Sequence, residues 1–273
     1  MSEPSRRTVL IAAGAASTGL WAAAAPGAAA AEPPRPAGPG AADNPVVREN
    51  RAEGSGRWAV GAGESRGVDL RAPQIQAYAS AASVTPDESL TLNVSGRTAA
   101  TCAIEIHRFG HYGGARSRLL HTAADVPVGR GWKLTVPHTW VSGLHLAVLT
   151  SADGYRAFTP FVVREPARRS DVLAVVPLSY AGRRPYPGLG LPEDFGADTS
   201  ACQWLEEAGY DVTYATEEDV RARRVDPRRY PAVLHPSAVA LPSPLALSEP
   251  GRTDPKVRHQ AAALLDGLIG RHR

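Results

Sequence analysis

The hydrophobic pattern of this chain changes near residue 170, and that change constrains the fold more than any other feature. Before it, apolar residues alternate with polar ones, as Leu90, Leu92 and Val94 do, which is typical of strands with one buried face. After it, residues 172–176 form a continuous apolar run, as expected of a strand covered on both faces. A chain of 273 residues has room for two domains of ordinary size. We therefore expect one domain over 68–166 and another over 170–273.

The first of these regions is predicted to be a β-sandwich. About seven short alternating segments, spaced by roughly a dozen residues, favour two packed sheets. Asp153-Gly154 is typical of a tight hairpin turn, here between expected strands at 144–150 and 155–163.

The second region alternates strands with helices, which predicts a parallel α/β layer. A helix is expected from an Asp198 cap to Gly209, followed by a strand at 211–215. Thr216 and the acidic residues after it begin another helix, and 231–234 is a third strand. A last helix is expected over about 254–271. Three strands are few for such a sheet, so this partial α/β domain is either a remnant or completed by another chain.

The N-terminus reads as a targeting segment. Arg6 and Arg7 form a twin-arginine pattern, an alanine-rich apolar stretch follows, and Ala29 and Ala31 offer a cleavage site before Glu32. The stretch is too diluted by alanine and glycine for a membrane-spanning helix. We expect residues 1–31 to be a signal peptide and the protein to be exported to the extracellular space or cell envelope, with no stable membrane insertion. Residues 32–67 are rich in Pro, Gly and Ala and are predicted to be an unstructured linker.

Charge and cysteine content exclude several classes of protein. The net charge is only +3, and no long basic run provides the concentrated positive face of a nucleic-acid-binding protein. Cys102 and Cys202 are too few for a disulfide scaffold and fall in different expected domains, so two separate buried thiols are the preferred interpretation.

The densest motif is IEIHRFGHYGGARSRLL, residues 104–120. His107 and His111 have the spacing of a helical metal pair, but Ile104 and Ile106 indicate a strand. The Gly113-Gly114 pair could open a phosphate-binding helix, yet the flanking alternation argues against a helix. The pattern favours a strand, a turn and a strand.

A possible serine nucleophile has the wrong context. Gly63 to Gly67 matches the G-x-S-x-G pattern of a nucleophile elbow, with Ser65 at its centre. That motif requires a strand before the serine and a helix after it. A linker precedes Ser65, and the sequence through Pro73 cannot begin a helix, so we expect no catalytic role.

Polar side chains follow the first expected α/β strand. Tyr180, Tyr186, Glu193 and Asp194 lie after residues 172–176, where open α/β sheets place ligands beyond the carboxyl ends of their strands. An ordinary solvent-exposed loop is the alternative interpretation.

Four stretches together resemble the N,N-dimethylformamidase beta subunit-like family. They are QAYASAASVTPDESLTLNVS, IEIHRFGHYGGARSRLL, TWVSGLHLAVLTSADGYRAFTPFVVRE and WLEEAGYDVTYATEEDV. The arginine, glycine, tyrosine and double glycine of HRFGHYGG look like the most distinctive signature of that family. The resemblance spans about residues 74 to 235.

The resemblance implies an immunoglobulin-like β-sandwich joined to a glutamine-amidotransferase-like α/β domain. It also implies amide hydrolysis at an iron held by two tyrosines and a glutamate, with a small second subunit or self-association. The chain departs from the family in two places. It reads LSYAGRRPYPGLG where relatives carry a loop resembling T-Y-Q-A-Y-N-x-W-G-G, and LHPSAVALPSP where they carry G-H-D-E-Y-W. The candidate iron ligands here are Tyr180, Tyr186 and Glu193, while His235 corresponds loosely to the histidine of the second segment.

Two hypotheses follow for function. One is an exported amidohydrolase-type relative that acts on a C–N bond, inactive as an isolated chain. The other is a noncatalytic exported binding module built on the sandwich. The departures suggest a truncated or divergent member, for which we expect substoichiometric iron and no formamide hydrolysis by the chain alone.

Overall fold

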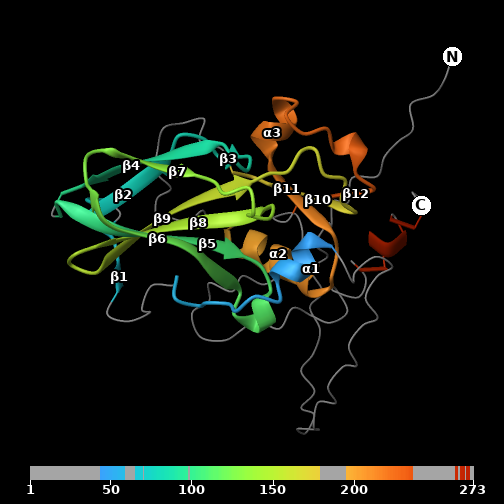
Figure 1. Ribbon diagram of the computed structural model, residues 1–273, viewed down its shortest axis with the longest axis horizontal. Helices are drawn as coiled ribbons and strands as arrows, with labels where there is room; N and C mark the ends of the chain where they lie inside the picture. The colour runs from blue at the N-terminus through green and yellow to red at the C-terminus, as the bar shows by residue number, and fades with distance from the viewer. Residues whose placement is uncertain are drawn as a thin grey trace, which may run out of the picture.

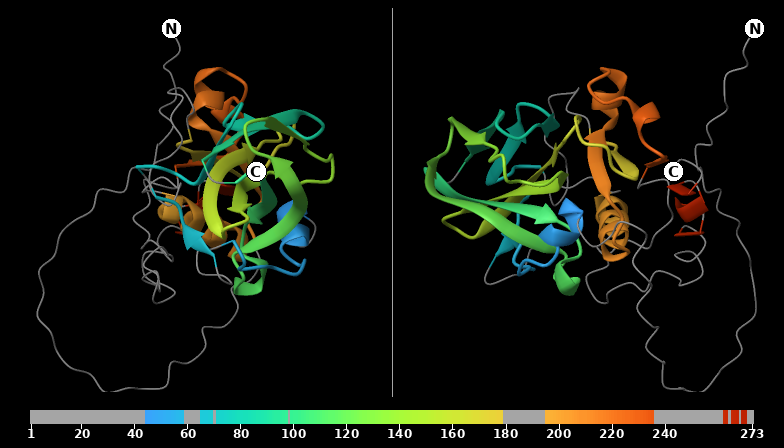
Figure 2. Two further views of the ribbon diagram at one scale, coloured as in Figure 1. Left: turned by 90° about the vertical axis from the view of Figure 1, so that its left-hand side faces the viewer. Right: turned by 45° about the vertical axis from the view of Figure 1, so that its right-hand side comes forward.

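The computed structural model describes residues 44–58, 65–69, 71–97, 99–178 and 195–235, with seven residues between 262 and 270. Strands β1–β9 form what we call the β unit, and β10, α2, β11, α3 and β12 form the parallel unit. Figure 1 shows the parallel unit beside one end of the β unit. In the end-on view of Figure 2, the strands of the β unit surround a common centre.

The larger sheet of the β unit is mixed. Its strands are β1 (Arg66–Gly67), β3 (Ser83–Val84), β5 (Thr101–Phe109), β6 (Ser117–Pro127), β8 (Gly143–Ser151) and β9 (Tyr155–Val163). The order is β1-β9-β8-β5-β6, with β3 also paired to β9. The long strands pair antiparallel, whereas β1 and β3 run parallel to β9.

A smaller antiparallel sheet covers one face of the larger one. It consists of β2 (Ile75–Ala79), β4 (Ser89–Gly96) and β7 (Gly131–Thr135) in the order β2-β4-β7. Leu90, Leu92 and Val94 of β4 are buried in the core between the sheets, together with Ile104 and Ile106 of β5. The alternation in the sequence therefore identifies the inner face correctly.

The parallel unit is a three-stranded sheet with the order β11-β10-β12. β10 (Val172–Val176) lies between β11 (Val212–Thr216) and β12 (Ala232–Leu234), and all pairings are parallel. Helix α2 (Phe195–Glu207) connects β10 to β11, while α3 (Glu217–Arg221) and a 3-10 turn, η2 (Pro227–Arg229), lead to β12. The described residues between 262 and 270 are helical, and Leu265 and Ile269 are buried.

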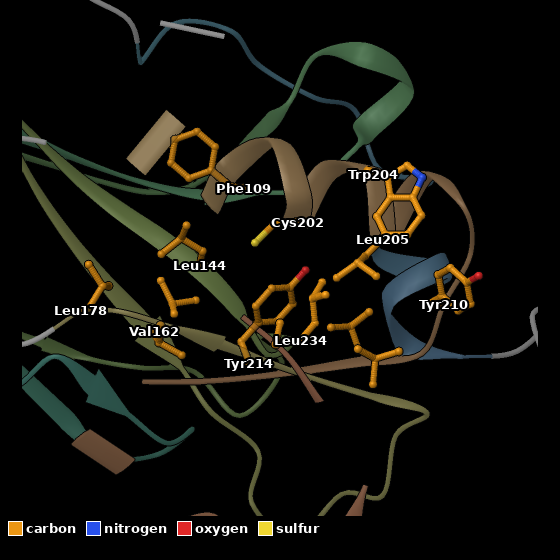
Figure 3. Close-up of a cluster of buried hydrophobic side chains, with 14 of the residues drawn as sticks. Phe109, Leu144, Val162, Leu178, Cys202, Trp204, Leu205, Tyr210, Tyr214 and Leu234 are labelled. Carbon is orange, nitrogen blue, oxygen red and sulfur yellow. The ribbon is translucent and has the colours of Figure 1, made fainter. Parts of the chain in front are cut away.

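A second core joins the two units (Figure 3). The outer face of the larger β sheet contributes Phe109 and Leu144, and the parallel unit contributes Tyr214, Cys202 and Leu205 to the same cluster. Strand β8 is consequently buried on both faces. The alternation of β8 suggested one exposed face, which is wrong because the parallel unit packs over it.

Residues 44–58 correct the prediction of an unstructured linker over 32–67. Asn44 caps the short helix α1 (Pro45–Glu49) by accepting from the Val47 amide at 2.8 Å, and Val46 is fully buried. The Asn44 side-chain amide also donates to the Gly209 carbonyl at 3.1 Å, which ties α1 to the end of α2. A five-residue helix has too few turns for a visible period, and its order comes from tertiary hydrogen bonds.

Local start and stop signals are mostly confirmed. Thr216 and Asp219 form a complete capping box at the start of α3. The Gly154 turn joins β8 and β9, and Gly209 has a φ of +78° just after α2. The Asp198 cap is wrong, because α2 begins three residues earlier at Phe195.

The β-rich character predicted from the sequence is confirmed. Cys102 and Cys202 form no disulfide and are buried in different cores, which confirms the preferred interpretation of two separate buried thiols. Within the described ranges, no helix has the length and apolarity needed to span a membrane. The proposed signal peptide, residues 1–31, lies outside those ranges.

Candidate functional site at the junction of the two units

The signature stretch is a strand, a turn and a strand, as predicted. β5 and β6 pair antiparallel, and the 3-10 turn η1 (Tyr112–Gly114) lies between them. Tyr112 has a φ of +44°, followed by Gly113 at +62° and Gly114 at +94°. The double glycine suits this left-handed backbone, which a side chain strains. The Asn50 side chain accepts from the backbone amides of His111 at 2.7 Å and Tyr112 at 3.0 Å, so the segment after α1 holds the turn.

The signature arginine crosses from the β unit to the parallel unit. Arg108, at the end of β5, binds Glu206 of α2 in a bidentate pair with N···O distances of 2.8 and 3.0 Å. Neither side chain is exposed to solvent. Arg108 also donates to the Ser142 carbonyl at 2.9 Å. A planar guanidinium matches a carboxylate in this way, so the pair fixes orientation as well as distance.

Further hydrogen bonds complete what we call the junction network: Arg108, Glu206, Tyr112, Tyr214 and Asn50. Glu206 accepts from the Tyr214 hydroxyl at 2.8 Å and from the Asn50 amide at 2.7 Å, in addition to Arg108. The Tyr112 hydroxyl accepts from Arg108 at 3.0 Å and donates to Glu49 of α1 at 2.9 Å. The Glu206 carboxylate is therefore fully hydrogen-bonded, as a buried charge requires.

Burial and neighbouring charges shift the pKa values of Arg108, Tyr112 and Tyr214 in this network, and of His145 beside it. Burial alone would lower the pKa of Arg108, but the adjacent Glu206 raises that pKa well above its ordinary value. Burial raises the pKa of Tyr112 and of Tyr214, so both phenols stay protonated. Burial and the nearby Arg108 lower the pKa of His145 to about 3, so its ring is neutral. That ring stacks between Trp140 and Phe161.

Two glycines make room for the pair. A Cβ on Gly110 would meet the Glu206 Oε2 atom at 2.4 Å and the Arg108 Nη1 atom at 2.8 Å. A Cβ on Gly143 would meet the Arg108 Nε atom at 2.7 Å. The arginine, the glycine and the tyrosine of the signature thus have one physical explanation, which is a close, desolvated contact between the units.

The junction network does not fit the iron implied by the resemblance. Tyr112, Tyr214 and Glu206 are two phenols and a carboxylate, which is the donor set expected. Arg108, however, binds the carboxylate through both oxygens, and the raised pKa of each phenol opposes the phenolate form that iron would need. We assign these residues to the contact between the units.

The candidate ligands Tyr180, Tyr186 and Glu193, with Asp194, lie outside the described residues, so their roles stay predictions. β10 ends at Val176, and His235 directly follows β12. In a sheet ordered β11-β10-β12, the chain passes from β10 to β11 on one side and then returns to β12 on the other side of β10. The carboxyl ends of β10 and β12 therefore flank the switch point, where open α/β sheets bind ligands.

The histidine pair and the Ser65 motif do not form a functional site among the described residues. His107 is buried on β5 with its Nε2 atom 3.5 Å from Glu105, while His111 precedes η1, so the two do not share a helix face. Ser65 is followed by strand β1, and not by the helix that a nucleophile elbow requires. Within the described ranges, no cluster of three or more His, Cys, Asp or Glu side chains could hold a metal ion.

An open polar cleft of about 610 Å³ also lies where the units meet. Its walls come from the β2–β3 connection, the start of β4, the end of β9 and the α3 region. We call it the junction cleft, and it is lined by Ser80, Ala81, Ala82, Ser83, Glu88, Ser89, Arg164, Glu218 and Arg224. The α3 region follows the carboxyl end of β11, so the cleft borders the edge at which α/β sheets bind ligands.

Solved structures similar to the chain are distant. A cycloisomaltooligosaccharide glucanotransferase from Paenibacillus sp. is 17% identical with a TM-score of 0.26, covering 43% of this chain and 17% of that one. The pectate lyase Pel3 from Pectobacterium carotovorum is 9% identical with a TM-score of 0.23, covering 38% and 33%. Murine CEACAM1b is 15% identical with a TM-score of 0.21, covering 37% and 61%. The chain thus spans less than two thirds of each, and scores this low support no conclusion.

One family model matches the chain. It describes the C-terminal part of N,N-dimethylformamidase beta subunit-like proteins and covers residues 103–181, from β5 through β10. No curated protein matches significantly. The matched segment contains Arg108, Gly110 and Tyr112. The resemblance inferred from the sequence is thereby confirmed over residues 103–181, which match the model of the N,N-dimethylformamidase beta subunit-like family.

Proposed function

We propose that this chain is an amidohydrolase-type protein that hydrolyses a C–N bond of a small amide once it is assembled with a partner chain. The observation that supports this most is the family match over residues 103–181, which includes the arginine that joins the two units. In this proposal the β unit is an immunoglobulin-like sandwich and the parallel unit is glutamine-amidotransferase-like.

The described residues act as a framework in this proposal. The junction network is buried, and both Glu206 oxygens are occupied by hydrogen bonds from Arg108, Tyr214 and Asn50, so it leaves no carboxylate available for acid–base or nucleophilic chemistry. Its role is to hold the carboxyl edge of the parallel sheet at a fixed place beside the β unit. The reacting groups would then come from Tyr180, Tyr186 and Glu193, or from a partner chain.

Iron enters the proposal only through those three residues. A metal ion held by phenolates and a carboxylate polarises an amide carbonyl. Several prolines and glycines surround Tyr180 and Tyr186 in the sequence, and ligands without supporting contacts bind metal weakly. We therefore expect less than one iron per isolated chain.

The test is an assay of dimethylamine release from N,N-dimethylformamide. It compares the purified chain with the complex captured through a tag on this chain from its native cells. We expect hydrolysis by the complex and none by the chain alone. A complex without activity on N,N-dimethylformamide and other small formamides would refute the hydrolase. Stoichiometric iron in the isolated chain that is lost in a Tyr180→Phe variant would refute the need for a partner.

Export is part of the proposal. Substitution of Arg6 and Arg7 by Lys should keep the protein in the cytoplasm, because the twin-arginine pathway reads that pair. Mass spectrometry of the exported protein should find an N-terminus at Glu32. An unprocessed N-terminus outside the cell would contradict this.

A noncatalytic binding module is the second candidate, and the junction cleft favours it. The cleft is open, polar and formed by both units, as binding sites between domains commonly are. In this alternative the native complex has no amidase activity, whereas the cleft still binds its ligand.

A further inference from the structure

We propose that the junction cleft binds a short peptide through both of its charged ends. This inference is independent of the proposed amidase activity. It depends on two arginines that offer hydrogen-bond donors, two glutamates that offer acceptors, and the size of the cleft.

The donors come from Arg164 and Arg224. Arg164 has its Nε atom 3.3 Å from the Ser83 hydroxyl and 3.4 Å from Asp219, and Arg224 has its Nη1 atom 3.3 Å from the same carboxylate oxygen. Among the described residues, the recorded contacts of these side chains use Nε and Nη2 of Arg164 and Nη1 of Arg224. Each guanidinium is therefore anchored on one side and has donors left for a carboxylate.

Asp219 organises the arginines and is not itself a ligand group. Its carboxylate is buried and accepts from the Ser83 hydroxyl at 2.6 Å, the Thr216 amide at 2.9 Å and the Thr216 hydroxyl at 2.7 Å. These bonds belong to the capping box of α3 and to a contact with β3. The anchoring carboxylate thus links the two units beneath the cleft.

The acceptors come from Glu88 and Glu218. Glu88 has a side chain 56% exposed and lies 3.6 Å from Arg164, while Glu218 is 37% exposed and lies 3.4 Å from Arg224. Glu88 Oε2 also accepts from the Thr85 amide at 2.9 Å, and Glu218 meets Arg224 through Oε1. The second oxygen of each carboxylate, Oε1 of Glu88 and Oε2 of Glu218, is therefore the acceptor proposed for an ammonium group.

The balance of charge selects the class of ligand. Glu88, Glu218 and Asp219 place three carboxylates beside two guanidinium groups. A simple anion therefore gains little net attraction, and a simple cation is repelled by the arginines. A ligand with a carboxylate at one end and an ammonium at the other satisfies both sets. This complementarity is the basis for specificity in a polar site.

The size and lining of the cleft favour a peptide with small side chains. A volume of about 610 Å³ lies within the usual range for ligand pockets and exceeds the needs of one amino acid. Ala81 and Ala82 contribute small apolar surface. Among the described residues that line the cleft there is no aromatic side chain on which a sugar or a base would stack.

Three matched peptides test the proposal: tri-alanine, N-acetyl-tri-alanine and tri-alanine amide. They share a backbone, but the second lacks the ammonium group and the third lacks the carboxylate. Isothermal titration calorimetry on the purified protein should show tri-alanine binding at least about tenfold more tightly than either capped peptide, as expected for the loss of one ionic contact.

Two variants test which residues bind the carboxylate end of the peptide and which bind its ammonium end. Arg224→Gln should weaken tri-alanine binding about tenfold while leaving the amide unaffected, because the amide has no carboxylate to lose. The Glu88→Gln/Glu218→Gln variant should also weaken tri-alanine binding about tenfold. It should leave binding of the N-acetyl peptide unaffected, because that peptide has no ammonium group to lose. Arg228→Gln is the control, since Arg228 is exposed and does not line the cleft.

Three results would overturn the proposal. They are equal affinity for all three peptides, no binding of tri-alanine at millimolar concentration, and binding that Arg224→Gln leaves unchanged. A peptide-binding protein whose native complex lacks amidase activity would refute the proposed function and leave this inference standing.

Discussion

The junction network and the junction cleft are both arginine–carboxylate clusters between the same two units, yet they differ in burial. In the network, Arg108 and Glu206 have no exposed side-chain surface and Glu206 accepts from three side chains. In the cleft, Arg224 and Glu218 are 45% and 37% exposed and meet only at 3.4 Å. Burial with several hydrogen bonds to the carboxylate makes an ion pair a structural contact, whereas partial exposure leaves donors and acceptors for a ligand.

The largest effect is expected from breaking the buried pair. Arg108→Met should lower the free energy of unfolding by about 3–5 kcal/mol, because it leaves the Glu206 charge buried without its partner. Urea denaturation followed by circular dichroism measures the change. Arg228→Gln, at an exposed pair, is the control and should change little.

A double variant sharpens this prediction. Arg108→Met combined with Glu206→Met removes both charges, and we expect it to be more stable than Arg108→Met alone. Apolar replacement of a whole buried pair is often close to neutral. If the double variant were as unstable as the sum of the two single changes, the pair would not be coupled, and our account of the network would fail.

The pH dependence of stability should come largely from His145, which lies beside Arg108 of the junction network. The pKa of His145 in the folded protein is about 3, against about 6.5 in the unfolded chain. Between these values the unfolded chain binds a proton that the folded one does not. Stability from this group is complete above pH about 6.5 and is lost as the pH falls toward 3, by up to about 1.4 kcal/mol per pH unit.

His145→Phe should flatten this slope, since a phenyl ring can stack between Trp140 and Phe161 without titrating. The measurement is denaturation at several pH values from roughly 4 to roughly 7, which cover most of the interval between the two pKa values. Some slope should remain, because burial also lowers the pKa of His107. His138→Phe, at an exposed position, should keep the slope of the unsubstituted protein. An equally steep slope in His145→Phe would contradict the assignment.

Close packing in the network predicts a smaller effect. Gly110→Ala should lower the free energy of unfolding by about 1–3 kcal/mol, because its Cβ would lie 2.4 Å from the Glu206 Oε2 atom. Gly56→Ala is a matched control, since its added Cβ would contact nothing within 4 Å and its backbone is not in the left-handed region. Similar thermal stability for both alanine variants would show that the contact tolerates the added volume.

The sequence predicted the elements better than the contacts between them. Period-two and continuous apolar patterns act over a few residues, so they identified strands β4, β8, β9 and β10 and the turn at Gly154. A buried arginine was detectable in principle, because Arg108 stands between Ile106 and Phe109 in an apolar strand. Its partner was not detectable, since Glu206 is 98 residues away and spacing carries no information over that distance.

Tertiary contacts also explain the predictions that were wrong. β8 has the alternation of a half-exposed strand, but the parallel unit covers its second face. The composition around α1 predicted no structure, whereas Asn44 and Asn50 obtain their order from α2 and the signature turn. The cleft could not be predicted, because its walls come from four separate segments of the chain.

The smallest effect on stability is expected in the cleft. Arg224→Gln removes a half-exposed guanidinium whose contacts to Glu218 and Asp219 are 3.4 and 3.3 Å, so the free energy of unfolding should change by less than about 1 kcal/mol. Asp219 keeps its bonds from Ser83 and Thr216, which hold the capping box together. A chemical denaturation curve that overlaps that of the unsubstituted protein, together with weaker binding of tri-alanine, would separate ligand recognition from folding at this site. If Arg224→Gln lost as much stability as Arg108→Met, Arg224 would be a structural contact between the units. Weaker binding of tri-alanine by that variant would then reflect a damaged fold and not the loss of a ligand contact.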